Sequence, residues 1–269
     1  MNLVKINLII FLILIISKKI AFRKNKISPT IFTYIYNNNY YISINYIKKL
    51  KKLVYSVLLG EYDELRSFNR QIGWDYYLFT DVVNINKSNW TILPIPEDIK
   101  NLNISRVKKQ RFLKLHPHLY FKNYTLSIYI DASFKITRDL DEFLMRTLSD
   151  KHNMYTLEHP ERNTILNETF AVISCRKEKK EMSELIREKY KYEGFPDNNG
   201  LIESCLIIRK HNQKNLIELM NSWYSQINKN SHRDQLSFNY VLWKTGLKIK
   251  YINKNFAYLY FHQNLFHLK

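Results

Sequence analysis

From Lys52 onward, short apolar runs alternate with longer amphipathic stretches. Continuous apolar, β-prone runs predict buried strands at 53–59, 74–80, 90–94, 126–130, 206–208 and 248–252. Apolar residues at helical spacing predict helices at 105–115, 140–148, 165–175, 178–192, 213–228 and 234–245. Strands that alternate with helices indicate an α/β fold with a mostly parallel central sheet flanked by helices. In such sheets ligands bind at the carboxyl ends of the strands.

The N-terminal part has a different pattern. An apolar run from Leu8 to Ile16 is shorter than the about 20 residues that span a bilayer, and Lys and Arg follow it closely. We expect 1–26 to be a hydrophobic segment with a basic flank, 27–51 an Asn- and Tyr-rich low-complexity stem, and 52–269 the folded domain. The run 3–17 predicts a single membrane anchor, in the secretory pathway or on a cytosolic membrane face; a helix docked on the domain is the alternative.

Composition and charge exclude several classes of protein. The chain has 269 residues, of which 45% are hydrophobic and 14% aromatic, so wholesale disorder is excluded. Two Cys exclude a disulfide scaffold and a Cys-based zinc module. The net charge of +18, from 42 Lys and Arg against 24 Asp and Glu, is compatible with a nucleic acid, membrane or phosphorylated partner. Because Lys, Asn, Ile and Tyr share AT-rich codons, we attribute most of this charge to codon composition.

An acidic residue directly follows one of the predicted strands. The stretch Tyr129-Ile-Asp-Ala-Ser-Phe134 places Asp131 at the end of the strand 126–130. A carboxylate there is costly unless it has a partner, and it is suited to hold Mg²⁺ or Mn²⁺ together with substrate phosphates. The alternative is a cap of a following helix.

A basic stretch precedes that strand. Arg111 and Lys114 are three residues apart, so they share a face of the predicted helix, and Arg106, Lys108 and Lys109 come before them. Paired cations of this kind can hold a diphosphate. A solvated basic helix face is the alternative.

Two polar segments lie further along the chain. The first, Gly194 to Glu203, contains the Gly, Pro and Asn of a tight loop, whose amides can bind sugar hydroxyls, and it leads through Glu203 into a strand. The second, Ser231 to Phe238, places Arg, Asp and Gln at a helix start, where Asp234 can be an N-cap or recognise a polyol.

Taken together, these segments resemble a glycosyltransferase of the GT-A fold. The resemblance is closest to the family once catalogued as domain of unknown function 616, whose plant members include proteins described as mucilage glycosyltransferases and one described as a ceramidase. The matching stretches come in the family's order: 54–65 with Gly60-Glu-Tyr-Asp-Glu-Leu65, Phe79-Thr-Asp81, Arg111 to His118, Tyr129-Ile-Asp-Ala-Ser133, His159-Pro-Glu-Arg162, Glu193 to Glu203, and Arg233-Asp-Gln-Leu-Ser-Phe238.

The resemblance implies a nucleotide-sugar donor and a glycan or glycoconjugate acceptor, with no nucleic acid as partner. It places Asp81 beside the nucleotide, with Arg111, Lys114 and Asp131 also on the donor side. Asp131 would occupy the metal position of a D-x-D motif, for Mn²⁺ or Mg²⁺; Ser133 replaces the second acid, which makes the motif D-x-S. His262 and His267 are candidates for a late metal ligand.

The same resemblance assigns the remaining roles. Glu203 and Asp234 are the candidate bases of an inverting reaction. Sugar and acceptor would be bound by His159, Arg162, Asn198, Asn199, Gly200, Arg233 and Gln235. Two other functions compete. A hydrolase such as a ceramidase rests on one relative's description, and neither a G-x-S-x-G elbow nor an H-E-x-x-H motif is present. A non-catalytic nucleic-acid binder rests on the net charge alone.

Overall fold

The computed structural model describes residues 43–60, 65–83 and 89–263. The apolar run at 3–17, most of the expected stem and His267 lie outside these residues. Within the described ranges, no helix has both the length and the apolar character that crossing a membrane requires. The described end of the expected stem, from Ser43, contains a short helix that packs on the domain through the buried side chain of Ile47.

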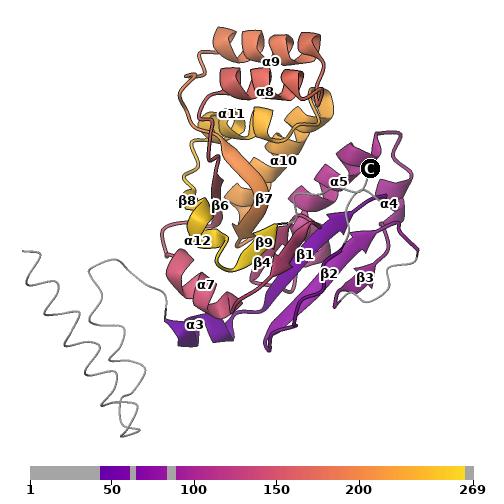
Figure 1. The fold of residues 1–269 in the computed structure, drawn as a ribbon, viewed down its shortest axis with the longest axis vertical. Helices are drawn as coiled ribbons and strands as arrows, with labels where there is room; N and C mark the ends of the chain where they lie inside the picture. Colours follow the sequence, from indigo (N-terminus) through magenta and orange to yellow (C-terminus); the bar gives the residue numbers. More distant parts are fainter. Residues whose placement is uncertain (1–42, 61–64, 84–88, 264–269) are drawn as a thin grey trace, which may run out of the picture.

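A seven-stranded sheet forms the centre of the protein, in the order β3-β2-β1-β4-β7-β6-β8 (Figure 1). A two-stranded sheet, β5-β9, accompanies it. In the large sheet β7 runs antiparallel to both of its neighbours, whereas the other pairs are parallel. The strands are β1 (Lys52–Leu58), β2 (Trp74–Thr80), β3 (Thr91–Leu93), β4 (Leu126–Ile130), β5 (Phe134–Ile136), β6 (Met154–Glu158), β7 (Ile202–Arg209), β8 (Lys250–Ile252) and β9 (Phe261–Gln263).

Helices cover both faces of this sheet. They are α3 (Ile44–Lys49), α4 (Glu97–Lys100), α5 (Arg106–Leu115), α6 (Pro117–Tyr120), α7 (Leu140–Thr147), α8 (Ile165–Ser174), α9 (Lys180–Tyr192), α10 (Lys214–Lys229), α11 (Gln235–Thr245) and α12 (Lys254–Ala257). In Figure 1, α8 to α11 gather at one end of the molecule, while α4 and α5 lie over β1 to β3. Polar side chains cap the N-termini of several of these helices. At the start of α5, for example, Ser105 Oγ accepts a hydrogen bond from the backbone N–H of Lys108.

Two hydrophobic cores explain why the central strands are mostly apolar. Along β1, Leu53, Tyr55 and Val57 pack toward α5, α10 and α11, while Val54 and Leu58 pack toward α3 and α7. A strand that buries both of its faces reads as a continuous apolar run rather than an alternating one. This is the reason that β1, β2 and β4 were predictable from the sequence.

The expected α/β fold, with a mostly parallel sheet flanked by helices, is confirmed. The short strands β5, β6 and β9 were not predicted. The predicted strand 206–208 is in fact β7, Ile202–Arg209, so Glu203 lies inside a strand rather than ahead of one. Three-residue strands such as β5 and β9 carry too few positions to show a period of two.

The topology brings distant parts of the chain to one edge of the sheet. The carboxyl ends of the parallel strands β1, β2 and β4 meet there, and because β7 is antiparallel, its first residues lie at the same edge. The backbone N–H of Asp131 donates to the carbonyl oxygen of Cys205 at 3.0 Å, which joins the end of β4 to the start of β7. A functional site is therefore expected along this edge.

Candidate functional site

A cavity of about 430 Å³ opens at the carboxyl ends of β1, β2 and β3. Thr80 and Asp81 form one wall, where β2 ends. The basic side chains of Lys100, Arg106 and Lys109 come from α4 and α5 and form another. A cavity lined by both cationic and carboxylate side chains is suited to a polar anion such as a nucleotide.

Asp81 makes two polar contacts with other residues at this cavity. One carboxylate oxygen accepts from the backbone N–H of Gly60 at 2.6 Å, and the other lies 3.6 Å from Arg106 Nε. Gly60 has φ +75°, a left-handed conformation that glycine adopts without strain. The side chains of Arg106 and Asp81 remain 66% and 36% exposed, so a ligand can reach both. Asp81 thus lines a cavity at the sheet edge together with Arg106, and its contact with a nucleotide stays a prediction.

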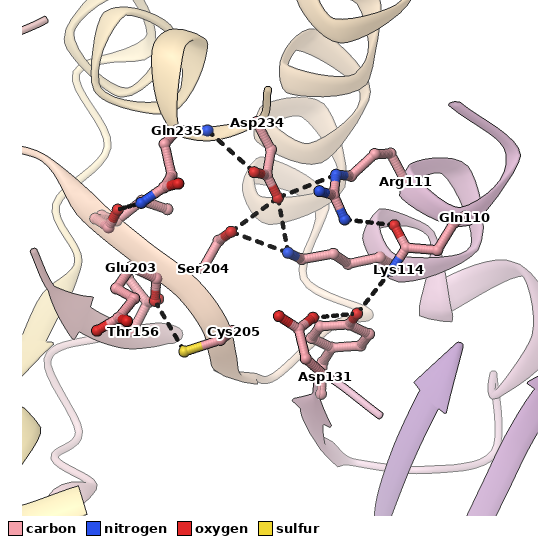
Figure 2. Close-up of polar contacts among 12 residues, drawn as sticks. Gln110, Arg111, Lys114, Asp131, Thr156, Glu203, Ser204, Cys205, Asp234 and Gln235 are labelled. Carbon is pink, nitrogen blue, oxygen red and sulfur yellow. Dashed lines mark hydrogen bonds and ion pairs between the residues drawn. The ribbon is translucent and has the colours of Figure 1, made fainter. Parts of the chain in front are cut away.

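Asp131 lies further along the edge and is held by a buried tyrosine (Figure 2). The Tyr129 hydroxyl donates to Asp131 Oδ1 at 2.7 Å, and Gln110 Nε2 donates to the Tyr129 oxygen at 2.9 Å. Burial raises the pKa of Tyr129 well above its usual range, and the Asp131 carboxylate raises it further, so the phenol keeps the proton that it donates. The second carboxylate oxygen of Asp131 is left to face the site.

Asp234, at the start of α11, is the centre of a buried ionic cluster. Its Oδ2 accepts from Lys114 Nζ at 2.7 Å and from Ser204 Oγ at 2.8 Å, and Arg111 Nε lies 3.4 Å away. Burial raises the pKa of Asp234, but the charges of Arg111, Lys114 and Arg233 more than offset it, so the pKa lies well below its usual range. The carboxylate is therefore ionised under all ordinary conditions.

These contacts change the expected roles of two residues. Lys114 is only 1% exposed and donates to Asp234 and to Ser204, so its ammonium is committed inside the protein and does not face a diphosphate. Asp234 is likewise buried, and a carboxylate with a strongly depressed pKa is a poor base. The shared face of Arg111 and Lys114 was predicted correctly, but it points at a protein carboxylate.

Arg111 is under the electrostatic influence of both acidic residues of the site. Burial lowers the pKa of its guanidinium, but the carboxylates of Asp234 and Asp131 outweigh burial and raise it. Its side chain retains 15% exposure. Arg111 is therefore the cation of the predicted pair that remains available at the edge.

Glu203 lies at the start of β7, next to helix α12. Lys254 Nζ lies 3.0 Å from Glu203 Oε1 and 2.9 Å from Oε2, and also lies over the Tyr258 ring, 5.0 Å from its centre. Burial raises the pKa of Tyr258, and the charges of Cys205, Glu203 and Asp131 raise it further, while the hydroxyl donates to Gln263 Oε1 at 2.7 Å.

Lys254 and Tyr258 were missed by the sequence analysis. Both residues follow the predicted strand 248–252. Asp131 was singled out because it is a polar residue just past the end of a strand, and the same rule applies to Lys254. Only the return of the chain to the sheet, however, brings α12 against Glu203.

His159 and Arg162 form a separate cluster at the end of β6. The Arg162 guanidinium donates from Nε to Glu168 Oε2 at 2.7 Å, and its Nη2 lies 2.9 Å from His159 Nε2. Burial lowers the pKa of His159, and the charge of Arg162 lowers it further, so the imidazole is neutral. Glu168, which is buried, is the anion of this cluster and was not predicted.

The expected sugar-binding loop lies against the start of β7 and α11. The backbone carbonyl of Asn199 accepts from Asn239 Nδ2 at 3.0 Å, Gly200 adopts φ +77°, and the Asn198 side chain is exposed. Gln235 Nε2 donates to the carbonyl of Ile202 at 3.0 Å. The contact of Gln235 with Ile202 places α11 beside the start of β7, one residue before Glu203; the sugar-binding role of Asn198, Asn199, Gly200 and Gln235 stays a prediction.

Arg233 lies on the segment just before α11. Its backbone N–H donates to Ser231 Oγ at 2.9 Å, and its charge helps to lower the pKa of Asp234. Arg233 therefore contributes to the electrostatics of the buried cluster.

The expected metal ligands are only partly brought together. His262, on β9, lies opposite Lys135 of β5 with an exposed side chain, and no group of three His, Cys, Asp or Glu that could hold a metal exists among the described residues. Asp131 offers a carboxylate oxygen, and Ser133 a hydroxyl. Because Mg²⁺ and related ions take one or two carboxylates and complete their shell with phosphate and water oxygens, these residues fit a cation that binds together with a diphosphate.

Comparison with known proteins supports one family. The model of the family described as TOD1/MUCI70, glycosyltransferase-like domain, matches residues 88–266, more than half of the chain. The match includes Arg111, Asp131, Glu203 and Asp234, whereas Asp81 lies before it. No curated protein sequence shows a significant match.

Several solved structures are similar to this chain at TM-scores below 0.5. The apo structure of the bifunctional glycosyltransferase WbbM has a TM-score of 0.44 and 13% identity over 76% of this chain, which spans 39% of that protein. The apo form of mouse xyloside xylosyltransferase 1 has a TM-score of 0.44 and 11% identity, and the match covers 75% of this chain and 85% of that one. The mannosyltransferase Ktr4p from S. cerevisiae in complex with GDP has a TM-score of 0.43 and 10% identity, and the match covers 77% of this chain and 70% of that one.

Proposed function

The chain belongs to the TOD1/MUCI70 glycosyltransferase-like family, and from this we propose that it transfers a sugar from a nucleotide-sugar donor to a hydroxyl of a glycan or glycoconjugate. The observation that carries the proposal is the order of groups along one sheet edge. A basic cavity beside Asp81 is followed by Arg111 and Asp131, and then by Glu203 and the loop at Asn198.

This order matches the parts of a nucleotide sugar. We assign the nucleoside to the cavity at β1 to β3, the diphosphate to the region of Arg111 and Asp131, and the sugar to the start of β7. Neighbouring strands lie about 4.8 Å apart, so the distance from β2 to β7 across β1 and β4 suits an extended donor.

The chemical problem is the negative charge that the leaving diphosphate gains as the glycosidic bond breaks. Arg111, held among carboxylates in a partly buried position, supplies fixed positive charge near that place. A divalent cation held by Asp131 and Ser133 would neutralise further charge on the diphosphate.

An inverting transfer also needs a carboxylate that accepts the proton of the attacking hydroxyl. Of the two expected bases, Asp234 is locked in the buried ionic cluster, which leaves Glu203 at the edge of the sheet. We propose Glu203 for this role, with Lys254 holding its carboxylate in place.

A panel of donors tests the proposed function. We expect one class among UDP-, GDP- and CMP-sugars, with Mn²⁺ present, to raise the melting temperature, because a ligand at 100 times its Kd stabilises the native state by about 2.7 kcal/mol. The same donor should then support transfer to a glycan acceptor. The proposed function would be contradicted if none of these donors stabilised the protein and none of their sugars were transferred. A parallel incubation with ceramide tests the hydrolase alternative, for which released fatty acid is the readout.

The position of the nucleotide gives a second prediction. Arg106→Ala should weaken donor binding about tenfold, because it removes a charge-assisted contact from the cavity next to Asp81. Lys108→Ala is the matched control: it removes the same charge from the same turn of α5, but Lys108 donates to the carbonyl of Asn228 and does not line the cavity. Calorimetric titration measures both. Equal losses in the two variants would mean that only the overall charge matters.

A further inference from the structure

Gln110 connects the two charged clusters of the site. Its Nε2 donates to the Tyr129 hydroxyl oxygen at 2.9 Å, and its Oε1 accepts from Arg111 Nη1 at 2.5 Å. Tyr129 in turn donates to Asp131, and Arg111 contacts Asp234. Figure 2 shows this line of contacts running from Asp131 through Gln110 to the cluster at Asp234. No role was assigned to Gln110 by the sequence.

The chemistry of these groups allows only one direction of donation. A guanidinium has donors but no acceptor, so it requires the oxygen end of the Gln110 amide. The NH₂ end then faces the Tyr129 oxygen and donates to it. The phenol proton is thereby directed to Asp131, which as a carboxylate only accepts. Donation runs from Arg111 to Gln110, to Tyr129 and to Asp131, and each contact fixes the orientation of the next.

We call this series of hydrogen bonds, from Arg111 through Gln110 and Tyr129 to Asp131, the relay. Its middle is rigid. Tyr129 is fully buried, its ring packs against that of Tyr55 at 5.3 Å between centroids, and Lys114 Nζ lies 5.0 Å from its ring centre. A short Asp side chain at a strand end can otherwise turn through a broad range of χ2. A hydroxyl fixed by such packing selects one orientation, with one oxygen bound and the other facing the site.

We propose that Gln110 and Tyr129 are positioning residues, which hold the Asp131 carboxylate and the Arg111 guanidinium in one arrangement around the donor's diphosphate. The inference deepens the proposed glycosyltransferase function and rests on it. The two residues touch neither donor nor acceptor. They act by removing the reorganisation that Asp131 and Arg111 would otherwise need when the diphosphate leaves.

Tyr129→Phe tests the relay, because it removes only the hydroxyl. We expect turnover at saturating donor to fall about 10- to 100-fold, and the Mn²⁺ concentration that half-saturates binding of UDP or GDP to rise by a similar factor. The KM for the donor should change much less, because the cavity at Asp81 is untouched. Tyr124→Phe is the matched control: it removes a hydroxyl that bonds Asp75 at the opposite end of β2, and it should behave as wild type.

Gln110→Glu distinguishes a directional relay from simple packing. Glutamate keeps the size of the side chain and pairs with Arg111, but it cannot donate to Tyr129 and instead competes with Asp131 for the phenol proton. We therefore expect the loss of turnover seen in Tyr129→Phe, without loss of thermal stability. Gln110→Glu with wild-type turnover would overturn the directional relay.

Combination with Asp131→Ala completes the test. If Tyr129 acts through Asp131, then adding Tyr129→Phe to Asp131→Ala should cause no further loss of turnover or of nucleotide binding. Additive losses, or a Tyr129→Phe enzyme with wild-type turnover and Mn²⁺ response, would overturn the proposal while leaving the glycosyltransferase function intact. A wild-type chain that binds and transfers no donor would instead overturn the proposed function itself.

Discussion

Asp234→Ala is expected to destabilise the protein by about 3–5 kcal/mol, the range for removal of one partner of a buried ion pair. The substitution leaves the Lys114 ammonium, only 1% exposed, with the neutral Ser204 hydroxyl as a partner. It also removes the contact that joins α5 to the start of α11. Urea denaturation at neutral pH, followed by circular dichroism, measures the change in the free energy of unfolding.

Asp139→Ala is the control for this prediction. Asp139 is also an acidic N-cap, with Oδ1 accepting from the backbone N–H of Glu142 at 2.6 Å, but its side chain is exposed. Its loss should cost about 1 kcal/mol. A double variant, Asp234→Ala with Lys114→Met, should recover part of the lost stability, because it also removes the unpaired charge. Equal effects of Asp234→Ala and Asp139→Ala would show that the cluster acts only as a cap.

The pH dependence of this contribution follows from the direction of the shift. The pKa of Asp234 is depressed in the folded state from 3.8, so its contribution is present above the pKa of the unfolded chain. It is lost as the pH falls through the lower, folded-state pKa. The difference in stability between wild type and Asp234→Ala should therefore be constant from about pH 7 to pH 5, and shrink only below about pH 4.

Asp131→Ala is expected to reduce sugar transfer by about 100- to 1,000-fold or more, the range for loss of one preorganised electrostatic group. The fold should survive, because Asp131 is half-buried and Tyr129 keeps its bond to Gln110. We expect the free energy of unfolding to change by less than about 1 kcal/mol.

Transfer and stability must be measured on the same preparations of Asp131→Ala. Asp150→Ala, an exposed acidic residue between α7 and β6, makes the same chemical change away from the sheet edge and should transfer sugar as wild type does. Undiminished transfer by Asp131→Ala would sink the role assigned to Asp131, and a folded but inactive variant would support it.

Predictability from sequence differed between the fold and the site. The continuous apolar runs of β1, β2 and β4 and the position of Asp131 at a strand end were visible, because burial on both faces leaves a local pattern. The direction of β7 was not visible, since nothing in an apolar run tells which way a strand runs. Yet that direction is what brings Glu203 to the edge that carries Asp131.

The buried cluster shows the same limit at the level of single side chains. The spacing of Arg111 and Lys114 indicated a shared helix face but not what the face meets. Only the packing of α5 and α11 on α10 brings Lys114 to Asp234, about half the chain away in sequence.

The sequence by itself determined the α/β class, most of the strands and helices, and the family, because hydrophobic periodicity and short motifs are local properties. The tertiary structure alone decided which charged groups meet. It turned Lys114 and Asp234 from donor-facing and catalytic candidates into a buried ion pair, added Lys254 to Glu203, and joined Gln110 to Asp131 through Tyr129. The reason is that a charge acts according to its distance from other charges and from water, and the fold alone sets both.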